Sequence, residues 1–150
     1  MANKDNPGTG RNFEKLAKVY LKRSENLDLN SKVSLEISAN KNAAKPHFFD
    51  LGSNENKVIV ECKCHSWTKN RNVPSAKMAV WNEAMYYFIL APDCYRKILF
   101  VKRIYCEKRK ETLAEYYTRI YSHLVPYGVE ILEYDLDTDK CFQVFPYKEK

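Results

Sequence analysis

Glycine and proline are scarce in this 150-residue chain, with four and six residues respectively. This composition excludes collagen-like repeats and Gly/Pro-rich linkers, which depend on these residues. Apolar residues make up 45% of the chain, and there are 11 tyrosines, so the sequence can form a hydrophobic core and is not disordered as a whole. The length predicts one domain over residues 1–150, with the polar residues 1–8 expected to be flexible.

Long hydrophobic runs are absent as well. The longest apolar run covers residues 84–91, far short of the ~20 residues that a transmembrane helix needs. The N-terminus lacks the apolar centre of a signal peptide, so we expect a cytoplasmic protein with no membrane partner. Five cysteines, an odd number without the spacing of a disulfide framework, predict free thiols in a reducing compartment.

Positive charge is concentrated in one part of the sequence. Residues 63–110 contain 11 Lys and Arg but only three acidic residues, a net charge of +8, whereas the rest of the chain carries −2. Such a block favours a polyanionic partner, most often nucleic acid. A solvated basic surface on a soluble protein would have the same composition, so charge alone leaves both interpretations open.

Hydrophobic periodicity predicts an α/β fold. Three early strands followed by alternating helices and strands favour a mixed central sheet flanked by helices. The expected elements are a helix over 10–24 capped by Thr9, strands over 33–37, 47–51 and 57–65, a helix over 76–90 capped by Ser75, a strand over 98–101, a charged connection over 102–111, a helix over 113–124 capped by Thr112, a strand over 129–134 and an edge strand over 142–145.

The strand over 57–65 carries the residues with the clearest chemistry. Alternation places Glu61 and Lys63 on one face of this strand. A two-residue turn at either 54–55 or 55–56 brings Asp50 to the same face, whereas an odd-length turn without a bulge would reverse it. Two neighbouring carboxylates require a cation, and oxygen ligands suit Mg²⁺. An adjacent ammonium can orient a metal-bound water, as phosphodiester hydrolysis requires.

Asp50, followed after a spacer of ten residues by Glu61-Cys62-Lys63, resembles the PD-(D/E)xK signature of restriction-endonuclease-like nucleases. The expected order αβββαβ over residues 10–101 is also that of the family core. The resemblance implies an endodeoxyribonuclease that uses Mg²⁺, or Mn²⁺ in its place, to activate a water for attack on DNA, leaving a 5′-phosphate. Many nucleases of this size act as dimers, so a homodimer is expected.

The resemblance also implies individual roles. Asp50, Glu61 and the backbone carbonyl of Cys62 would ligate the metal, and Lys63 would position the attacking water. Glu14, on the first expected helix, would ligate a second ion or bond a metal-bound water.

Donor side chains follow the strand and suit phosphate contacts: His65, Lys69 and Arg71, with Lys77 on the next helix. The Cys-x-Cys-His sequence at residues 62–65 lacks the paired spacing of a structural zinc site. Two other interpretations remain. The first is a non-catalytic module of the same fold that binds DNA or RNA, and the second is a basic protein-interaction domain. Dependence on a divalent metal separates both from a nuclease.

Overall fold

The computed structural model describes residues 10–147, so the flexible segment predicted for residues 1–8 and the cap predicted at Thr9 lie outside the described residues. The elements along the chain are α1 (Gly10–Glu25), β1 (Asn30–Ile37), β2 (Lys45–Ser53), β3 (Val58–Lys63), α2 (Ser75–Leu90), β4 (Arg96–Lys102), β5 (Tyr105–Cys106), β6 (Glu111–Thr112), α3 (Leu113–Tyr121), the 3₁₀ turn η1 (Ser122–Leu124), β7 (Val129–Asp135) and β8 (Lys140–Phe145).

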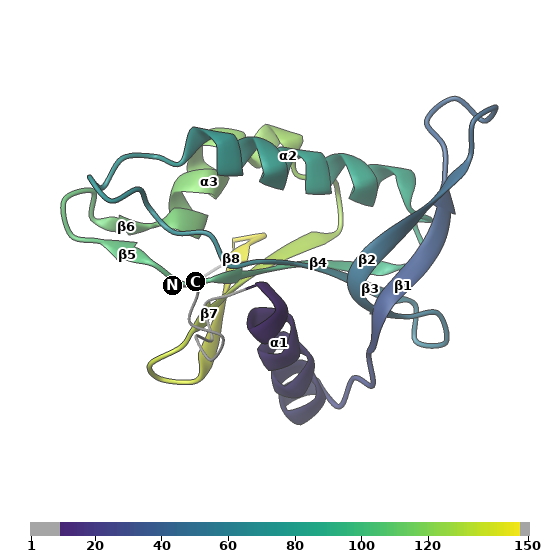
Figure 1. Ribbon diagram of the computed structural model, residues 1–150, viewed down its shortest axis with the longest axis horizontal. Helices are drawn as coiled ribbons and strands as arrows, with labels where there is room; N and C mark the ends of the chain where they lie inside the picture. Colours follow the sequence, from purple (N-terminus) through teal and green to yellow (C-terminus); the bar gives the residue numbers. More distant parts are fainter. Residues whose placement is uncertain (1–9, 148–150) are drawn as a thin grey trace.

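A six-stranded mixed sheet forms the centre of the molecule, in the order β1-β2-β3-β4-β7-β8. The strands β1, β2 and β3 are antiparallel to one another in turn, β3, β4 and β7 are parallel, and β8 is an antiparallel edge strand. Helix α1 covers one face, while α2 and α3 cover the other (Figure 1). The predicted α/β class, with a mixed central sheet flanked by helices, is therefore confirmed.

Two hydrophobic clusters hold the helices against the sheet. On one face, α1 buries Phe13, Ala17 and Leu21. On the other face, α2 and α3 bury Trp81 and Tyr117 completely. Each large apolar side chain buried in this way contributes roughly 1.5–3 kcal/mol to folding. No helix within residues 10–147 is long and apolar enough to cross a bilayer, and all five cysteines are free, as predicted.

The structure corrects three local predictions. Ser75 is the first residue of α2 and not its cap, because the cap position is Pro74, which has no side-chain donor or acceptor. The connection predicted over 102–111 contains the small β5–β6 hairpin. The third predicted helix ends at Tyr121 and continues only as the turn η1. By contrast, the cap predicted at Thr112 is confirmed as a complete capping box with Glu115.

Candidate active site

The β2–β3 hairpin sets the position of the acidic residues. Leu51 pairs with Val60, and Ser53 pairs with Val58. This is the register that a turn at 55–56 predicts, and it brings Asp50 opposite Glu61. Four residues, 54–57, form the turn in place of two. Because this number is also even, the predicted register relation holds over the paired part of the hairpin.

Regular pairing stops at Asp50. The pairing of β2 with β3 ends at Leu51, one residue after Asp50. In the pairing of β1 with β2, Leu51 and Phe49 both have partners, but Asp50 does not pair with Lys32, the residue opposite it. Lys32 has a positive φ of 55°. Phe49 packs in the cluster with α2, whereas Leu51 packs in the cluster with α1, although regular alternation would give both the same face. At this irregularity, Oδ2 of the Asp50 carboxylate accepts a hydrogen bond of 2.8 Å from the backbone N–H of Cys62.

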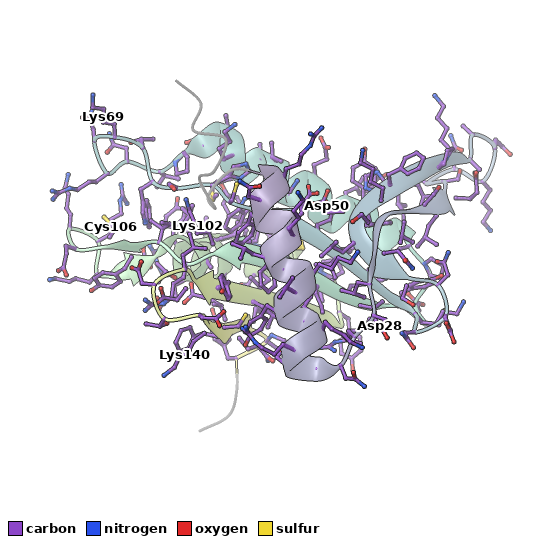
Figure 2. All side chains as sticks on the ribbon, turned by 60° about the horizontal axis from the view of Figure 1, so that its bottom comes forward. Asp28, Asp50, Lys69, Lys102, Cys106 and Lys140 are labelled. Carbon is purple, nitrogen blue, oxygen red and sulfur yellow. The ribbon has the colours of Figure 1, made fainter. Side chains whose placement is uncertain are left out.

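Three carboxyl groups gather at this irregularity. Burial and, after it, the charge of Asp50 raise the pKa of Glu61 to about 8, although Lys63 opposes the rise. The Lys63 Nζ lies 3.7 Å from Glu61 Oε2. Burial and Asp50 also raise the pKa of Glu14 on α1, against the charges of Lys32 and Lys63. Figure 2 shows Asp50 beside α1, where its charge can raise the pKa of Glu14. The structure thus brings together all four side chains predicted to be catalytic.

His47 also belongs to this site, and the sequence analysis missed it. Its Nε2 lies 3.3 Å from Glu61 Oε1, and its ring stacks on Tyr87 of α2 with centroids 3.7 Å apart. His47 and Asp50 are three residues apart, so strict alternation would place them on opposite faces of β2. Both nevertheless interact with Glu61, because the pairing is interrupted at Asp50. No signal in the sequence marks that interruption.

The raised pKa of Glu61 predicts how stability depends on pH. The folded protein keeps this proton up to a pKa of about 8, whereas the unfolded chain releases it near 4.5. Between these values the folded state binds more protons, so its stability falls as pH rises. His65, whose folded pKa is lowered to about 4, has the opposite effect, but only below its ordinary value of 6.5. Urea titrations without divalent metal should therefore show stability decreasing from pH 6.5 to 8.

Glu61→Gln is the control for this measurement, because glutamine mimics the protonated carboxyl group and cannot release a proton. The variant should lose less stability than the wild-type protein over pH 6.5–8. Equal slopes for the two proteins would contradict the assignment of the raised pKa to Glu61.

The donor set of this site suits a divalent ion. Asp50, Glu61 and Glu14 supply carboxylate oxygens, which suit a hard cation such as Mg²⁺. A cation among them would also relieve the repulsion and burial that raise the pKa of Glu61. In the described part of the chain, however, no three His, Cys, Asp or Glu side chains are already arranged as a metal-binding group. The chemistry of the donors fits the ion, and binding would require the carboxylates to adjust.

The residues predicted to bind nucleic acid are in two different environments. Lys69, Arg71 and Lys77 are exposed. His65 is half-buried, and its Nδ1 accepts a hydrogen bond of 2.8 Å from Nε1 of the buried Trp81. Burial, followed by the charge of Lys77, lowers the pKa of His65 to about 4. It is therefore neutral near pH 7 and offers no positive charge to a phosphate.

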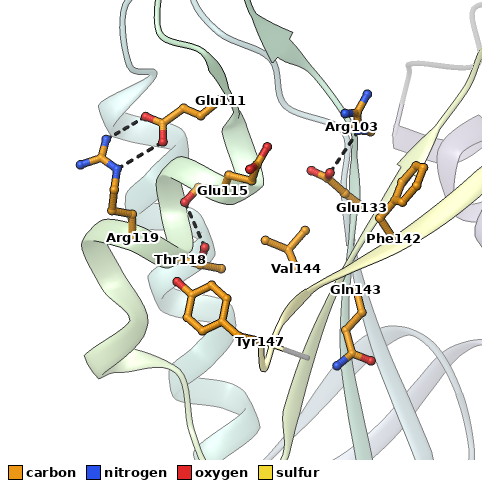
Figure 3. Close-up of a pocket in the computed structure, with 10 residues that line it drawn as sticks. All are labelled: Arg103, Glu111, Glu115, Thr118, Arg119, Glu133, Phe142, Gln143, Val144 and Tyr147. Atoms are coloured by element: carbon orange, nitrogen blue, oxygen red, sulfur yellow. Dashed lines mark hydrogen bonds and ion pairs between the residues drawn. The ribbon is translucent and has the colours of Figure 1, made fainter. Parts of the chain in front are cut away.

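A concavity lies between α3 and the strands β7 and β8, away from the carboxylate site (Figure 3). It has a volume of about 510 Å³, and no residue of the carboxylate site lines it. Its charged groups have partners within the protein: Arg119 binds Glu111 at 2.7 Å, Arg103 binds the buried Glu133 at 3.2 Å, and the Glu115 carboxylate accepts the backbone N–H of Thr112. These pairs satisfy the charges of the concavity, and we assign it no function.

Comparisons with models of protein families, with curated proteins and with solved structures found no match to this chain. The site is therefore interpreted from its own geometry and chemistry.

Proposed function

We propose that the protein is a divalent-metal-dependent endonuclease with a restriction-endonuclease-like core, which hydrolyses phosphodiester bonds in DNA. The observation that supports this best is the gathering of Glu14, Asp50 and Glu61 beside the amine of Lys63. Gathering three acids, of which Glu61 is buried, around one lysine is unfavourable for folding. Binding of a cation and a phosphate would compensate for this cost.

The order of the first elements also supports the proposal. From α1 to β4 the chain follows the sequence αβββαβ, as the resemblance to PD-(D/E)xK nucleases implies. Strands β3 and β4 are parallel neighbours, and Glu61 and Lys63 lie toward the carboxyl end of β3. Ligands of α/β sheets bind preferentially beyond the carboxyl ends of parallel strands.

In the proposed mechanism, Asp50, Glu61 and the carbonyl oxygen of Cys62 would hold Mg²⁺, or Mn²⁺ in its place. The bound ion would supply Lewis acidity at the phosphate and lower the pKa of a water. Lys63 would orient the attacking water and stabilise negative charge at the phosphorus, and Glu14 would accept a hydrogen bond from a water bound there. Dimerisation, which would bring two sites to the two strands of a duplex, stays a prediction.

The test is cleavage of supercoiled plasmid by the wild-type protein in Mg²⁺ and in excess chelator, beside Asp50→Asn. The asparagine keeps an oxygen for the Cys62 N–H but removes one of the proposed anionic ligands. We expect cleavage only by the wild-type protein with metal. Cleavage that survives in excess chelator, or that Asp50→Asn retains, would overturn the proposal.

Thermal melting provides a second readout in the same samples, independent of cleavage. A ligand at a hundredfold excess over its dissociation constant stabilises the folded state by about 2.7 kcal/mol. Mg²⁺ should therefore raise the melting temperature of the wild-type protein and leave that of Asp50→Asn unchanged. Without metal, Asp50→Asn should melt at a slightly higher temperature, because one source of repulsion is gone.

The alternative is a non-catalytic module of the same fold that binds DNA or RNA through its basic surface. The lack of a ready-made group of three metal-ligating side chains within residues 10–147 favours this alternative. It predicts DNA binding that is equal in Mg²⁺ and in chelator, no cleavage, and no metal effect on melting.

A further inference from the structure

Two segments that are distant in sequence leave the sheet at the same edge. Residues 64–74 follow β3, and residues 103–112 follow β4 and contain the β5–β6 hairpin. Because β3 and β4 are parallel neighbours, both segments emerge beside the candidate active site. Figure 1 shows them together at the left end of the molecule, and Figure 2 places Lys69 and Cys106 at that end. We call these two segments together the basic arm.

Specific contacts fasten the two halves of the basic arm. Trp67 donates a hydrogen bond from its Nε1 to the carbonyl oxygen of Ile104, at 3.0 Å. From the hairpin, the Arg109 Nε donates to the carbonyl oxygen of Arg71, also at 3.0 Å, and its guanidinium lies 5.2 Å from the centre of the Trp67 ring. Arg109 therefore acts as a clasp that joins the two segments through its Nε donor and the face of its guanidinium.

Four of the arm's six basic residues, Lys69, Arg71, Lys108 and Lys110, are exposed to a partner, whereas Arg103 is paired with Glu133 and Arg109 is used within the arm. Its two segments contain six basic and two acidic residues, a net charge of +4 out of the chain's +6. Lys69, Arg71 and Lys108 are exposed, and none forms an ion pair with another described residue. Lys110 is 75% exposed and pairs only with Glu107, itself 79% exposed, and such a pair contributes little to stability.

The aromatic residues of the arm decide which polyanion it fits. Single-stranded nucleic acid is held by stacking of its bases on exposed aromatic rings. Trp67 is only partly exposed and packs between Arg109 and Tyr116, which leaves Tyr105 as the exposed ring among the arm's described residues. The other exposed side chains of the arm are polar or charged, and its exposed basic residues, Lys69, Arg71, Lys108 and Lys110, contact phosphates without reading bases.

We propose that the basic arm binds the phosphate backbone of duplex DNA beside the candidate active site, without sequence preference. This inference deepens the proposed function by naming the form of its substrate. Binding by the arm needs no metal and no cleavage, so the proposal for the arm and the proposed nuclease function can fail independently.

The test is the affinity of the full chain for duplexes of unrelated sequence, in chelator, over a range of salt concentrations. The arm variant carries Lys69→Gln, Lys108→Gln and Lys110→Asn. The asparagine tolerates the positive φ of 58° at position 110. The matched control carries Lys18→Gln, Lys45→Gln and Lys41→Asn, all exposed and outside the arm, with a φ of 65° at position 41.

We expect equal affinity of the wild-type protein for different duplex sequences and a loss of about tenfold or more in the arm variant at low salt. Each lost phosphate contact lowers the slope of log K against log salt by about 0.9, so three contacts lower it by about 2.7. The control should keep the wild-type slope. Equal losses in the arm variant and the control would overturn the proposal, because binding would then follow net charge alone.

Arg109→Lys tests the fastening of the arm. Lysine keeps the charge but cannot both donate to Arg71 and stack on Trp67. Affinity should fall severalfold at unchanged net charge, with the melting temperature measured beside it to establish that the variant is folded. Unchanged affinity in a folded Arg109→Lys variant would overturn the inference that Arg109 holds the arm in place for binding.

The choice of duplex DNA is tested by comparing single strands with duplex. Tighter binding to single strands than to duplex, lost in Tyr105→Ala, would overturn that choice.

Discussion

Lys63→Ala is expected to slow DNA cleavage by about 10²–10⁴-fold, the range typical for loss of a group that acts on the attacking water. The Lys63 side chain is 19% exposed, and its amine lies 3.7 Å from Glu61 Oε2, so it is held at the carboxylates and is not a free surface charge. Duplex affinity should change by less than about threefold, because one cation among many makes a small contribution to phosphate binding. Single-turnover cleavage and equilibrium binding, measured separately, distinguish the two effects.

The experiment needs saturating metal and a pH above 8. Lys63 lowers the pKa of Glu61, so its removal raises that pKa further and weakens metal binding at neutral pH. Lys77→Ala is the matched control, since Lys77 is an exposed lysine on α2 outside the carboxylate cluster. It should lose some affinity and keep its rate of cleavage once bound. If Lys63→Ala also lost only affinity, Lys63 would have no role in the chemical step.

Thr112→Val is expected to lower the free energy of unfolding by about 2.5–4 kcal/mol. The buried hydroxyl of Thr112 accepts a hydrogen bond from the backbone N–H of Glu115, capping α3, and donates one of 2.7 Å to the buried carboxylate of Glu133. Loss of a cap costs about 1 kcal/mol. Loss of a hydrogen bond to a charged group adds about 1.5–3 kcal/mol. Valine has the shape of threonine, so packing should be preserved.

Urea unfolding of Thr112→Val and Thr112→Ser measures this effect. Serine keeps the hydroxyl and should cost less than about 1 kcal/mol, from the lost methyl group. Similar losses in both variants would mean that packing of the methyl group, and not the hydroxyl, stabilises this end of α3.

Local chemistry in the sequence was sufficient to predict the parts of the fold that depend on near neighbours. Thr112 and Glu115 are three residues apart, and the capping box that they form needs no other part of the chain. The hairpin relation between Asp50 and Glu61 likewise depends on an even-numbered turn. Where the local signal was weak, prediction failed: strands β5 and β6 have two residues each, too few to show an alternating pattern.

The site itself depended on tertiary structure. Regular alternation would place His47 and Asp50 on opposite faces of β2, yet both interact with Glu61 because pairing is interrupted at Asp50. The raised pKa of Glu61 comes first from burial, which requires the packed helices and not only the sequence of β3. The clasp between Arg109 and Trp67 likewise joins segments brought together by the parallel pairing of β3 and β4. Residue types and spacing determined which groups were present, whereas packing of distant segments decided which of them meet and which remain charged.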